Sequence, residues 1–250
     1  MLQHWILLIA AAFAAGTLNA IAGGGSFLTF PALVFTGLPP ITANATSAVA
    51  VSPGYLGSAL GFRAELSALP RERLVREGLI CAVGGVGGAL LLLVTPAKVF
   101  SAVVPWLLLF ATALFALGPR LLAARQRRGA GEFHPLAQSL GLLAVAIYGG
   151  YFNGGLGILL MALYTLTGET RVHTANALKN LNSLVLSLLS VAAFAWAGAI
   201  AWPQAVVMMV AATLGGFVGA RLARRLPAAG VRAVVVVTGV VMAVAFFARG

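Results

Sequence analysis

Apolar segments of about 20 residues recur along the whole of this chain, and each is long enough to cross a bilayer as a helix. Asp, Glu, Lys and Arg make up only 8% of its 250 residues, against about 25% in soluble domains. So few charges cannot cover a water-facing surface, which excludes a soluble protein. We therefore predict an all-α polytopic membrane protein surrounded by the lipid bilayer, with no nucleic-acid partner despite its net charge of +11.

Eight apolar segments are predicted to be full spans, and two shorter ones each follow a cluster of glycines. The full spans are expected at residues 4–22, 43–61, 78–94, 98–118, 136–152, 174–198, 203–220 and 231–248. The short, interrupted helices are expected at 26–38 and 157–168. Polar residues separate the spans at Arg63–Glu77, Arg120–His134 and Arg221–Arg232, and no carboxylate falls inside a predicted span.

The second half of the chain repeats the layout of the first. Residues 16–50 and 147–181 each contain a glycine cluster, a short apolar piece and then the sequence Thr-Ala-Asn-Ala, which starts at Thr42 and at Thr174. We predict a first transmembrane repeat over 1–118, a basic cytoplasmic linker over 119–134 and a second transmembrane repeat over 135–250. Duplicated membrane proteins with interrupted helices at matching positions are typical of transporters, and the interruptions indicate the binding site.

The basic residues favour an inverted orientation of the two repeats. If both short segments return to the side from which they enter, the loop Lys and Arg divide nine to six, which is no bias. If both cross, one side holds thirteen Arg and the other holds only Lys98 and Arg249, as the positive-inside rule expects. We therefore predict inverted repeats with both termini outside. The thirteen are Arg63, Arg71, Arg73, Arg76, Arg120, Arg125, Arg127, Arg128, Arg171, Arg221, Arg224, Arg225 and Arg232.

The glycine clusters are the first candidate binding site. Glycine allows one helix to end and another to begin at an angle. The new helix then points unpaired N–H groups and a partial positive charge into the protein. Two such helix starts meeting at the midplane would bind a small anion, which makes Gly24, Gly25 and Gly155 candidate ligands. Close helix packing through small residues is the alternative.

The two Thr-Ala-Asn-Ala segments are the second candidate. Asn44 and Ser47 in the first half, with Asn176 and Lys179 in the second, are expected at the same site. Asn and Thr also serve as helix N-caps, which is the alternative for the asparagines. Lys179 lies inside a predicted span, where a charge costs a few kcal/mol unless it is paired or snorkels to the surface. A bound anion would pair it.

Other residue types limit the chemistry. Glu169 and His173, at the entrance to the second repeat, are candidates for proton coupling because histidine titrates near neutral pH; a solvated helix start is the alternative. The sequence has no Cys/His cluster, no phosphate-binding loop and no carboxylate pair. We therefore predict no metal site, no cofactor and no enzymatic activity.

The first motif, AGGGSFLTFPALVFTGLPPITANATSAVAV, resembles the signature of the sulfite exporter TauE/SafE family. Its second-half counterpart, YGGYFNGGLGILLMALYTLTG followed by HTANALKN, resembles that family's second motif. It departs from the family at Asn153 and Leu156, where members often have a more glycine-rich run. The resemblance covers both repeats and implies a bacterial inner-membrane protein that moves small sulfur-containing anions, such as sulfite, sulfoacetate and related organosulfonates.

The residues and the resemblance converge on a secondary transporter, with export as the expected direction, for a small sulfur-containing anion. We expect alternating access, in which one repeat rocks against the other around an anion held by the candidate residues. A passive anion channel and a non-transporting membrane scaffold are the alternatives. The expected partners are the anion and the bilayer, and the sequence leaves a homo-oligomer open.

Overall fold

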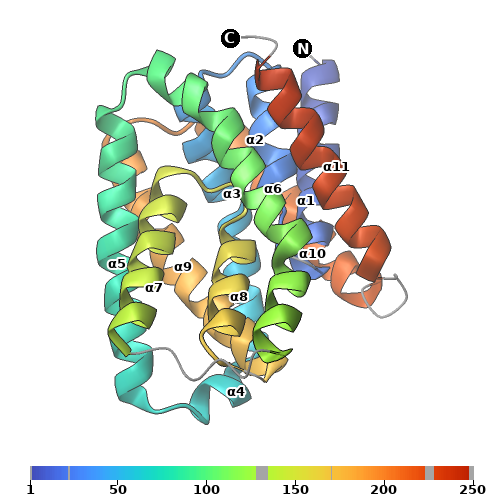
Figure 1. Cartoon of the computed structure of the whole chain (residues 1–250). Coiled ribbons are helices and arrows are strands. Elements are labelled where there is room, and N and C mark those ends of the chain that lie inside the picture. The colour runs from blue at the N-terminus through green and yellow to red at the C-terminus, as the bar shows by residue number, and fades with distance from the viewer. Residues whose placement is uncertain (1, 22, 128–134, 170, 223–227, 248–250) are drawn as a thin grey trace.

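The computed structural model describes residues 2–21, 23–127, 135–169, 171–222 and 228–247, and over these residues the chain forms eleven helices and no strand (Figure 1). The prediction of an all-α fold is confirmed for this part of the chain. In chain order the helices are α1 (Leu2–Ile21), α2 (Ser26–Phe35), α3 (Pro40–Gly61), α4 (Arg63–Ser67), α5 (Arg71–Val94), α6 (Ala97–Arg127), α7 (Pro135–Tyr151), α8 (Leu156–Leu166), α9 (Val172–Trp196), α10 (Trp202–Leu222) and α11 (Ala228–Phe247).

Within the described residues, four helices are long and apolar enough to cross a membrane. They are α1 over Leu2–Ala20, α5, α6 over Ala97–Gly118, and α9. Their outer faces carry large apolar side chains that remain exposed, such as Leu79 and Val83 on α5 and Trp106 on α6. A surface of this kind is unfavourable in water and favourable against lipid chains. The helices and their exposed faces therefore support a multi-pass membrane protein.

The two predicted short segments, 26–38 and 157–168, form the short helices α2 and α8. With 10 and 11 residues, each rises about 15 Å, which is half of the hydrocarbon thickness. In Figure 1 both termini lie at one end of the helix bundle and α4 lies at the other end. Helix α7 rises from the α4 end, and α8 turns back toward that end. The chain therefore enters the bundle, breaks and begins a new helix inside it.

Helices from the first half pack tightly against helices from the second half. Helix α1 lies along α10, where a side chain on Gly16 would collide with the backbone of Ala212. Helix α5 lies along α7 in the same way, because a side chain on Gly88 would collide with the carbonyl oxygen of Ile147. Glycine at these positions lets the two backbones touch, which is a common mode of helix association in membranes.

Two further helix pairs also join the halves. Helix α3 meets α9, where the hydroxyl oxygens of Ser52 and Ser187 are 2.7 Å apart. Helix α6 packs against α11, with Gly239 close against Thr112. In the predicted repeat α3 corresponds to α9, α6 to α11, α1 to α7 and α5 to α10. If the two halves are exchanged, the α1–α10 interface therefore becomes the α7–α5 interface and the reverse. The α3–α9 and α6–α11 interfaces each remain the same pair.

The structure corrects two predictions about the polar segments. Helix α5 begins at Arg71, so Glu77 lies in the second turn of a helix that is long enough to cross, and the prediction that no carboxylate falls inside a span is wrong. Pairing among polar side chains near the start of α5 allows the helix to extend this far. Helix α6 continues to Arg127, so the first part of the predicted linker 119–134 is helical, while residues 128–134 lie outside the described residues.

Candidate functional site

The two glycine breaks meet at the centre of the bundle. Helix α2 follows α1 after the first break, and α8 follows α7 after the second. Gly23 and Gly155 have positive φ values of 84° and 79°, which an L-residue with a side chain rarely adopts. A Cβ on Gly157 would lie 2.9 Å from the carbonyl oxygen of Gly23, so the two breaks are in direct contact. The positive φ at each break is thus possible because glycine occupies that position.

Side chains of the first half hold the second break in place. The Ser26 hydroxyl donates to the carbonyl oxygen of Asn153 at 2.9 Å and accepts from the N–H of Gly155 at 3.4 Å. The Asn44 amide donates to the carbonyl oxygen of Tyr151 at 3.2 Å and accepts from the N–H of Asn153 at 3.1 Å. Asn44 is only 1% exposed. These bonds fix the backbone from which α8 begins.

The Thr-Ala-Asn-Ala asparagines are not helix caps. The residues that cap α3 and α9 are Pro39 and Arg171, and neither makes a side-chain capping bond. Asn176 differs from Asn44, because it is partly exposed and its amide donates to the carbonyl oxygen of Val172 one turn earlier on α9. The structure therefore brings Asn44 to the central breaks and leaves Asn176 away from these contacts.

The other predicted residues of the first half are buried close to the first break. The Ser47 hydroxyl lies 2.6 Å from that of Thr29, a bond that joins α3 to α2. The Gly25 N–H donates to Asn19 at 3.4 Å, and the Gly24 carbonyl accepts from the first turn of α2. Neither Gly24 nor Gly25 has a positive φ, whereas Gly23, in the same break, does. Both glycines and Ser47 are buried.

Lys179 is buried beside the glycine breaks, and no described residue forms an ion pair with it. It is 7% exposed and lies on α9. A Cβ added to Gly23 would lie 3.6 Å from its Nζ, which places the ammonium group next to the first break. Within the described residues the ion pairs are Arg73–Glu77, Arg73–Glu169 and Arg171–Glu169, and none involves Lys179. An unpaired ammonium in an apolar interior is strongly unfavourable.

Asn153 is a central residue that the sequence analysis did not select as a ligand. It is 3% exposed, it stands three residues before the start of α8, and its Nδ2 has no hydrogen-bond partner. Its place before the second glycine pair was visible in the sequence, but the orientation of its amide was not. Lys179 lies next to Gly23 in the first break, and Asn153 lies in the second break, which touches the first at Gly157. This arrangement suits a small oxyanion.

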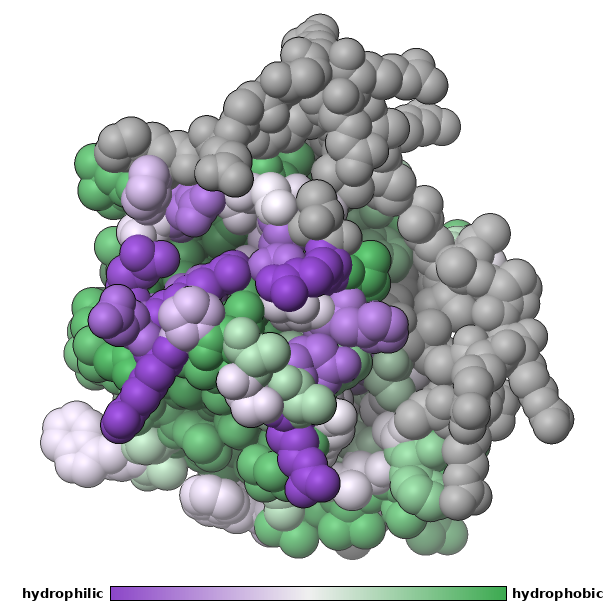
Figure 2. Space-filling model, turned by 90° about the horizontal axis from the view of Figure 1, so that it is seen from below, coloured by the Kyte–Doolittle hydropathy of each residue, from purple (hydrophilic) through white to green (hydrophobic). Residues whose placement is uncertain are grey.

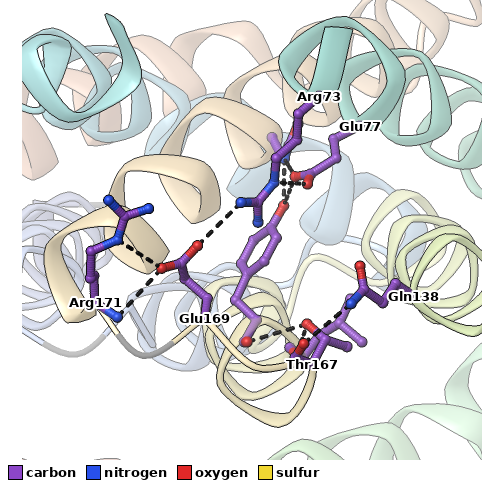
Figure 3. Close-up of polar contacts among 9 residues, drawn as sticks. Arg73, Glu77, Gln138, Thr167, Glu169 and Arg171 are labelled. Atoms are coloured by element: carbon purple, nitrogen blue, oxygen red, sulfur yellow. Dashed lines mark hydrogen bonds and ion pairs between the residues drawn. The ribbon is translucent and has the colours of Figure 1, made fainter. Parts of the chain in front are cut away.

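The entrance to the second repeat holds an ion-pair network (Figure 3). The Glu169 carboxylate accepts a hydrogen bond from the Arg73 guanidinium at 3.2 Å and another from the Arg171 guanidinium at 3.3 Å. His173 is exposed, with its ring centroid 6.3 Å from that of Phe62, and takes no part in these ion pairs. The structure thus places Glu169 in a network and His173 at the surface.

Glu77 extends this network into the protein. It is 7% exposed, and its Oε1 accepts from Arg73 at 2.8 Å. Its Oε2 accepts from the Tyr164 hydroxyl at 2.7 Å and from the Asn182 amide at 3.1 Å. No sequence pattern indicated this cluster, because its members come from α5, α8 and α9. The described residues contain no group of three or more His, Cys, Asp and Glu that could hold a metal ion.

Hydrophilic side chains gather on the end of the molecule at which α4 lies, and hydrophobic ones surround them (Figure 2). Exposed basic residues of the described part near this end are Arg63, Arg71, Arg76 and Arg171. Lys98, by contrast, is exposed at the start of α6, at the opposite end of α5. The described basic side chains are therefore distributed unequally between the two ends.

Comparison with known proteins identifies the family. The sulfite exporter TauE/SafE family matches residues 8–246. The chain is 28% identical to probable membrane transporter protein ORF9 of a Sinorhizobium species, over 96% of this chain and 91% of the relative. It is 31% identical to probable membrane transporter protein YfcA of Escherichia coli K12, over 92% and 85%. A probable membrane transporter protein of Haemophilus influenzae is also 31% identical, over 86% and 84%.

No solved structure matches the chain. The family match covers nearly the whole sequence, both predicted repeats included, and the relatives are named as transporters rather than as enzymes. Together with the apolar, lipid-compatible helices, this shows that the chain is a membrane transporter protein of the sulfite exporter TauE/SafE family.

Proposed function

We propose that this protein is a secondary transporter of small sulfur-containing anions, such as sulfite or organosulfonates, and that it works as an exporter. The anion binds between the starts of α2 and α8, beside Lys179. The observation that carries the proposal is the buried Lys179 ammonium, which has no counter-ion among the described residues. The family name and the transporter names of the relatives support the substrate class and the activity.

A bound oxyanion would remove the electrostatic cost of this site. Moving an ammonium group out of water costs several kcal/mol in real proteins, and a bound anion pairs that charge. The oxygens of a sulfite or sulfonate group accept several hydrogen bonds at once, and Asn153 Nδ2 is a buried donor without an acceptor. Charge-assisted hydrogen bonds of this kind are about twice as strong as neutral ones.

The remaining predicted residues have distinct roles in the proposal. Gly24, Gly25 and Gly155 allow the anion to approach the backbone at the two helix starts. Asn44 is a positioning residue, because both of its hydrogen bonds go to the backbone of the second break. Ser47 positions α2 through Thr29. Asn176 lies on the same helix as Lys179, three residues before it.

Two inverted repeats and alternating access complete the proposal. The exchange of helix pairs between the halves, α1 with α10 and α5 with α7, supports a two-fold relation between them. The excess of arginine at the α4 end favours a cytoplasmic position for that end. Both termini, which lie at the opposite end in Figure 1, then face outward from the inner membrane. Rocking of helices around the central site exposes it to each side in turn.

Transport assays in proteoliposomes test the proposal. Sulfite and a panel of sulfonates, with sulfate as the comparison, are each measured with wild-type protein, Lys179→Met and the control Lys98→Met. We expect saturable sulfite or sulfonate flux with wild type and its loss in Lys179→Met. Lys98→Met should keep the flux, because Lys98 is exposed at the end of the molecule. Absence of flux with wild type contradicts transport, and a current whose reversal potential follows the anion gradient alone identifies a channel.

A further inference from the structure

The ion-pair network at the α4 end ties a helix of the first half to two helices of the second (Figure 3). Arg73 on α5 pairs with Glu77 on its own helix and with Glu169, which stands three residues before α9. The Glu77 carboxylate also accepts hydrogen bonds from Tyr164 on α8 and Asn182 on α9. Bonds to a charged group are about twice as strong as neutral ones. The network therefore holds α5, α8 and α9 together.

The outer side of this network borders a small pocket. Arg73, Glu77 and Tyr164 line the pocket together with Arg76, which is exposed. Its volume of about 20 Å³ accommodates one water molecule. On the inner side the network ends at Asn182, which is 1% exposed and does not line the pocket. Water from the α4 end thus reaches one side of the network and not the other.

The proposed anion site begins where the network ends. Lys179 precedes Asn182 by three residues on α9, which places the two side chains on nearly the same face of the helix. Lys179 is 7% exposed and is not among the residues that line the pocket. The bonded side chains of Glu77 and Asn182 therefore stand between the water-accessible pocket and Lys179.

The matching positions in the other half carry apolar side chains. The spacing of 132 residues between the two Thr-Ala-Asn-Ala segments relates Arg73 to Ala205, Glu77 to Met209, Tyr164 to Ala32 and Asn182 to Ala50. All four of these counterparts lie in one apolar cluster. The network is thus a feature of the α4 end alone, and the repeat does not require it for packing.

We infer that this network is the gate between the α4 end and the proposed anion site. The inference rests on the proposed alternating access. In the closed state Arg73 bridges Glu77 and Glu169, as it does in this structure. In the open state the bridge from α5 to α9 is broken, and the anion passes to Lys179. The Arg73 side chain is 30% exposed, so water can replace its partners and opening costs little.

Cys81, the single cysteine of the chain, is a native reporter of this gate. It lies one helical turn after Glu77 on α5 and is fully buried. The probe is sulfonatoethyl methanethiosulfonate, a membrane-impermeant anion, applied briefly to intact cells and to inverted membrane vesicles. The α4 end faces the reagent in one of these two preparations. Wild-type Cys81 should stay nearly unlabelled in both.

Glu169→Gln removes the bridge from α5 to α9, and Arg171→Gln is its matched control. Arg171 pairs with Glu169 from two positions away, so its loss breaks no ion pair between helices. In the preparation that exposes the α4 end, Glu169→Gln should label Cys81 about two- to fivefold faster than wild type, the change that a partly exposed ion pair makes in an opening equilibrium. Arg171→Gln should label at the wild-type rate.

Three results of this labelling experiment would overturn the gate. They are an unchanged rate in Glu169→Gln, an equal increase in Arg171→Gln, and an increase only from the end opposite α4. Tyr164→Phe is the second variant if Glu169→Gln does not fold, because it keeps the ring and removes the hydroxyl that bonds both Glu77 and Asn182. The same increase is expected in Tyr164→Phe, and an unchanged rate there counts against the gate in the same way.

Covalent closure tests whether the gate opens during transport. Arg73→Cys and Glu169→Cys are combined in a Cys81→Ser background and joined by a short bifunctional methanethiosulfonate, whose disulfides a reductant cleaves. Joining them should abolish transport of sulfite or methanesulfonate, and reduction should restore it, while neither single-cysteine variant responds. Transport that continues after complete cross-linking refutes the gate. Absence of transport by wild type contradicts the proposed function instead, and the labelling of Cys81, which needs no substrate, still decides the gate.

Discussion

The Ser26 hydroxyl lies 2.9 Å from the carbonyl oxygen of Asn153, so the first residue of α2 is bonded across the bundle to the residue that precedes the α8 turn. These two residues belong to different halves and are 127 positions apart. Their bond holds the two helix starts at a fixed separation. The N–H groups that would face an anion are therefore positioned before any ligand arrives, which lowers the entropic cost of binding.

Replacement of Asn44 should destabilise the protein more than replacement of Asn176, although both lie in a Thr-Ala-Asn-Ala segment. Asn44→Ala removes two buried hydrogen bonds and leaves a carbonyl and an N–H of the second break unpaired, at about 1–3 kcal/mol each. Asn176→Ala removes one partly exposed bond within its own helix. Thermal unfolding of both variants in detergent measures the difference, and equal midpoints would contradict it.

Gly155→Ala should abolish transport, whereas Gly168→Ala should not. Both positions have a positive φ, of 79° and 102°, so each substitution costs about 1–2 kcal/mol in backbone strain. At Gly155 the new Cβ would also lie 2.8 Å from the Cβ of Ala111, while Gly168 has no atom within 4 Å. Flux per folded molecule is the measurement, with Gly168→Ala as the strain control. Matching flux would show that the central break tolerates a side chain.

The charge at position 179 should determine anion affinity. Lys179→Met removes a buried charge and keeps similar length, and charge-assisted bonds contribute about 1.5–3 kcal/mol, so affinity should fall by one to two orders of magnitude. Lys179→Arg keeps the charge with a planar shape and should retain part of the affinity. Calorimetry with sulfite on purified, folded variants distinguishes these outcomes. Unchanged affinity in Lys179→Met would show that Lys179 is not part of the anion site.

One single cysteine at the start of α5 and another at the start of α6 should report the orientation of the protein in the membrane. The native Cys81 is fully buried and should not react. Lys98→Cys should react with an impermeant thiol reagent added to intact cells, and Arg71→Cys should react only after the membrane is opened. Arg71 and Lys98 should lie on opposite sides of the membrane because α5, which lies between them in the chain, has 24 residues and spans about 36 Å. The reverse labelling pattern would place the termini inside.

The fold could be predicted where its causes are local in the sequence. Runs of apolar residues predict spanning helices, and glycine clusters predict the breaks before α2 and α8, because both depend on neighbouring residues. The place of Lys179 within an apolar segment was visible in the sequence, which left a buried and a snorkelling side chain open. The alternative of a snorkelling lysine is contradicted by its 7% exposure, since a snorkelling side chain extends to the surface.

The contacts of the site could not be predicted because they join distant residues. Glu77 bonds Tyr164 and Asn182 from 87 and 105 positions away. Hydropathy alone assigned Glu77 to a loop, since three arginines stand close before it. The two Thr-Ala-Asn-Ala segments differ for the same reason. Asn44 bonds the backbone of Tyr151 and Asn153 in the other half of the chain, whereas Asn176 bonds the carbonyl oxygen of Val172 on its own helix.

The close packing of α1 on α10 sets the order in which the protein can fold during synthesis. Thr17 on α1 donates to the carbonyl oxygen of Gly215, 198 residues later. At about 5–20 residues per second, α1 leaves the ribosome roughly 10 to 40 s before this partner does. Its face around Gly16 therefore meets lipid or insertion machinery throughout that interval, whereas α5 packs against α7 after a much shorter stretch of synthesis. An early helix that completes its packing so late is the part of this molecule most exposed to quality control.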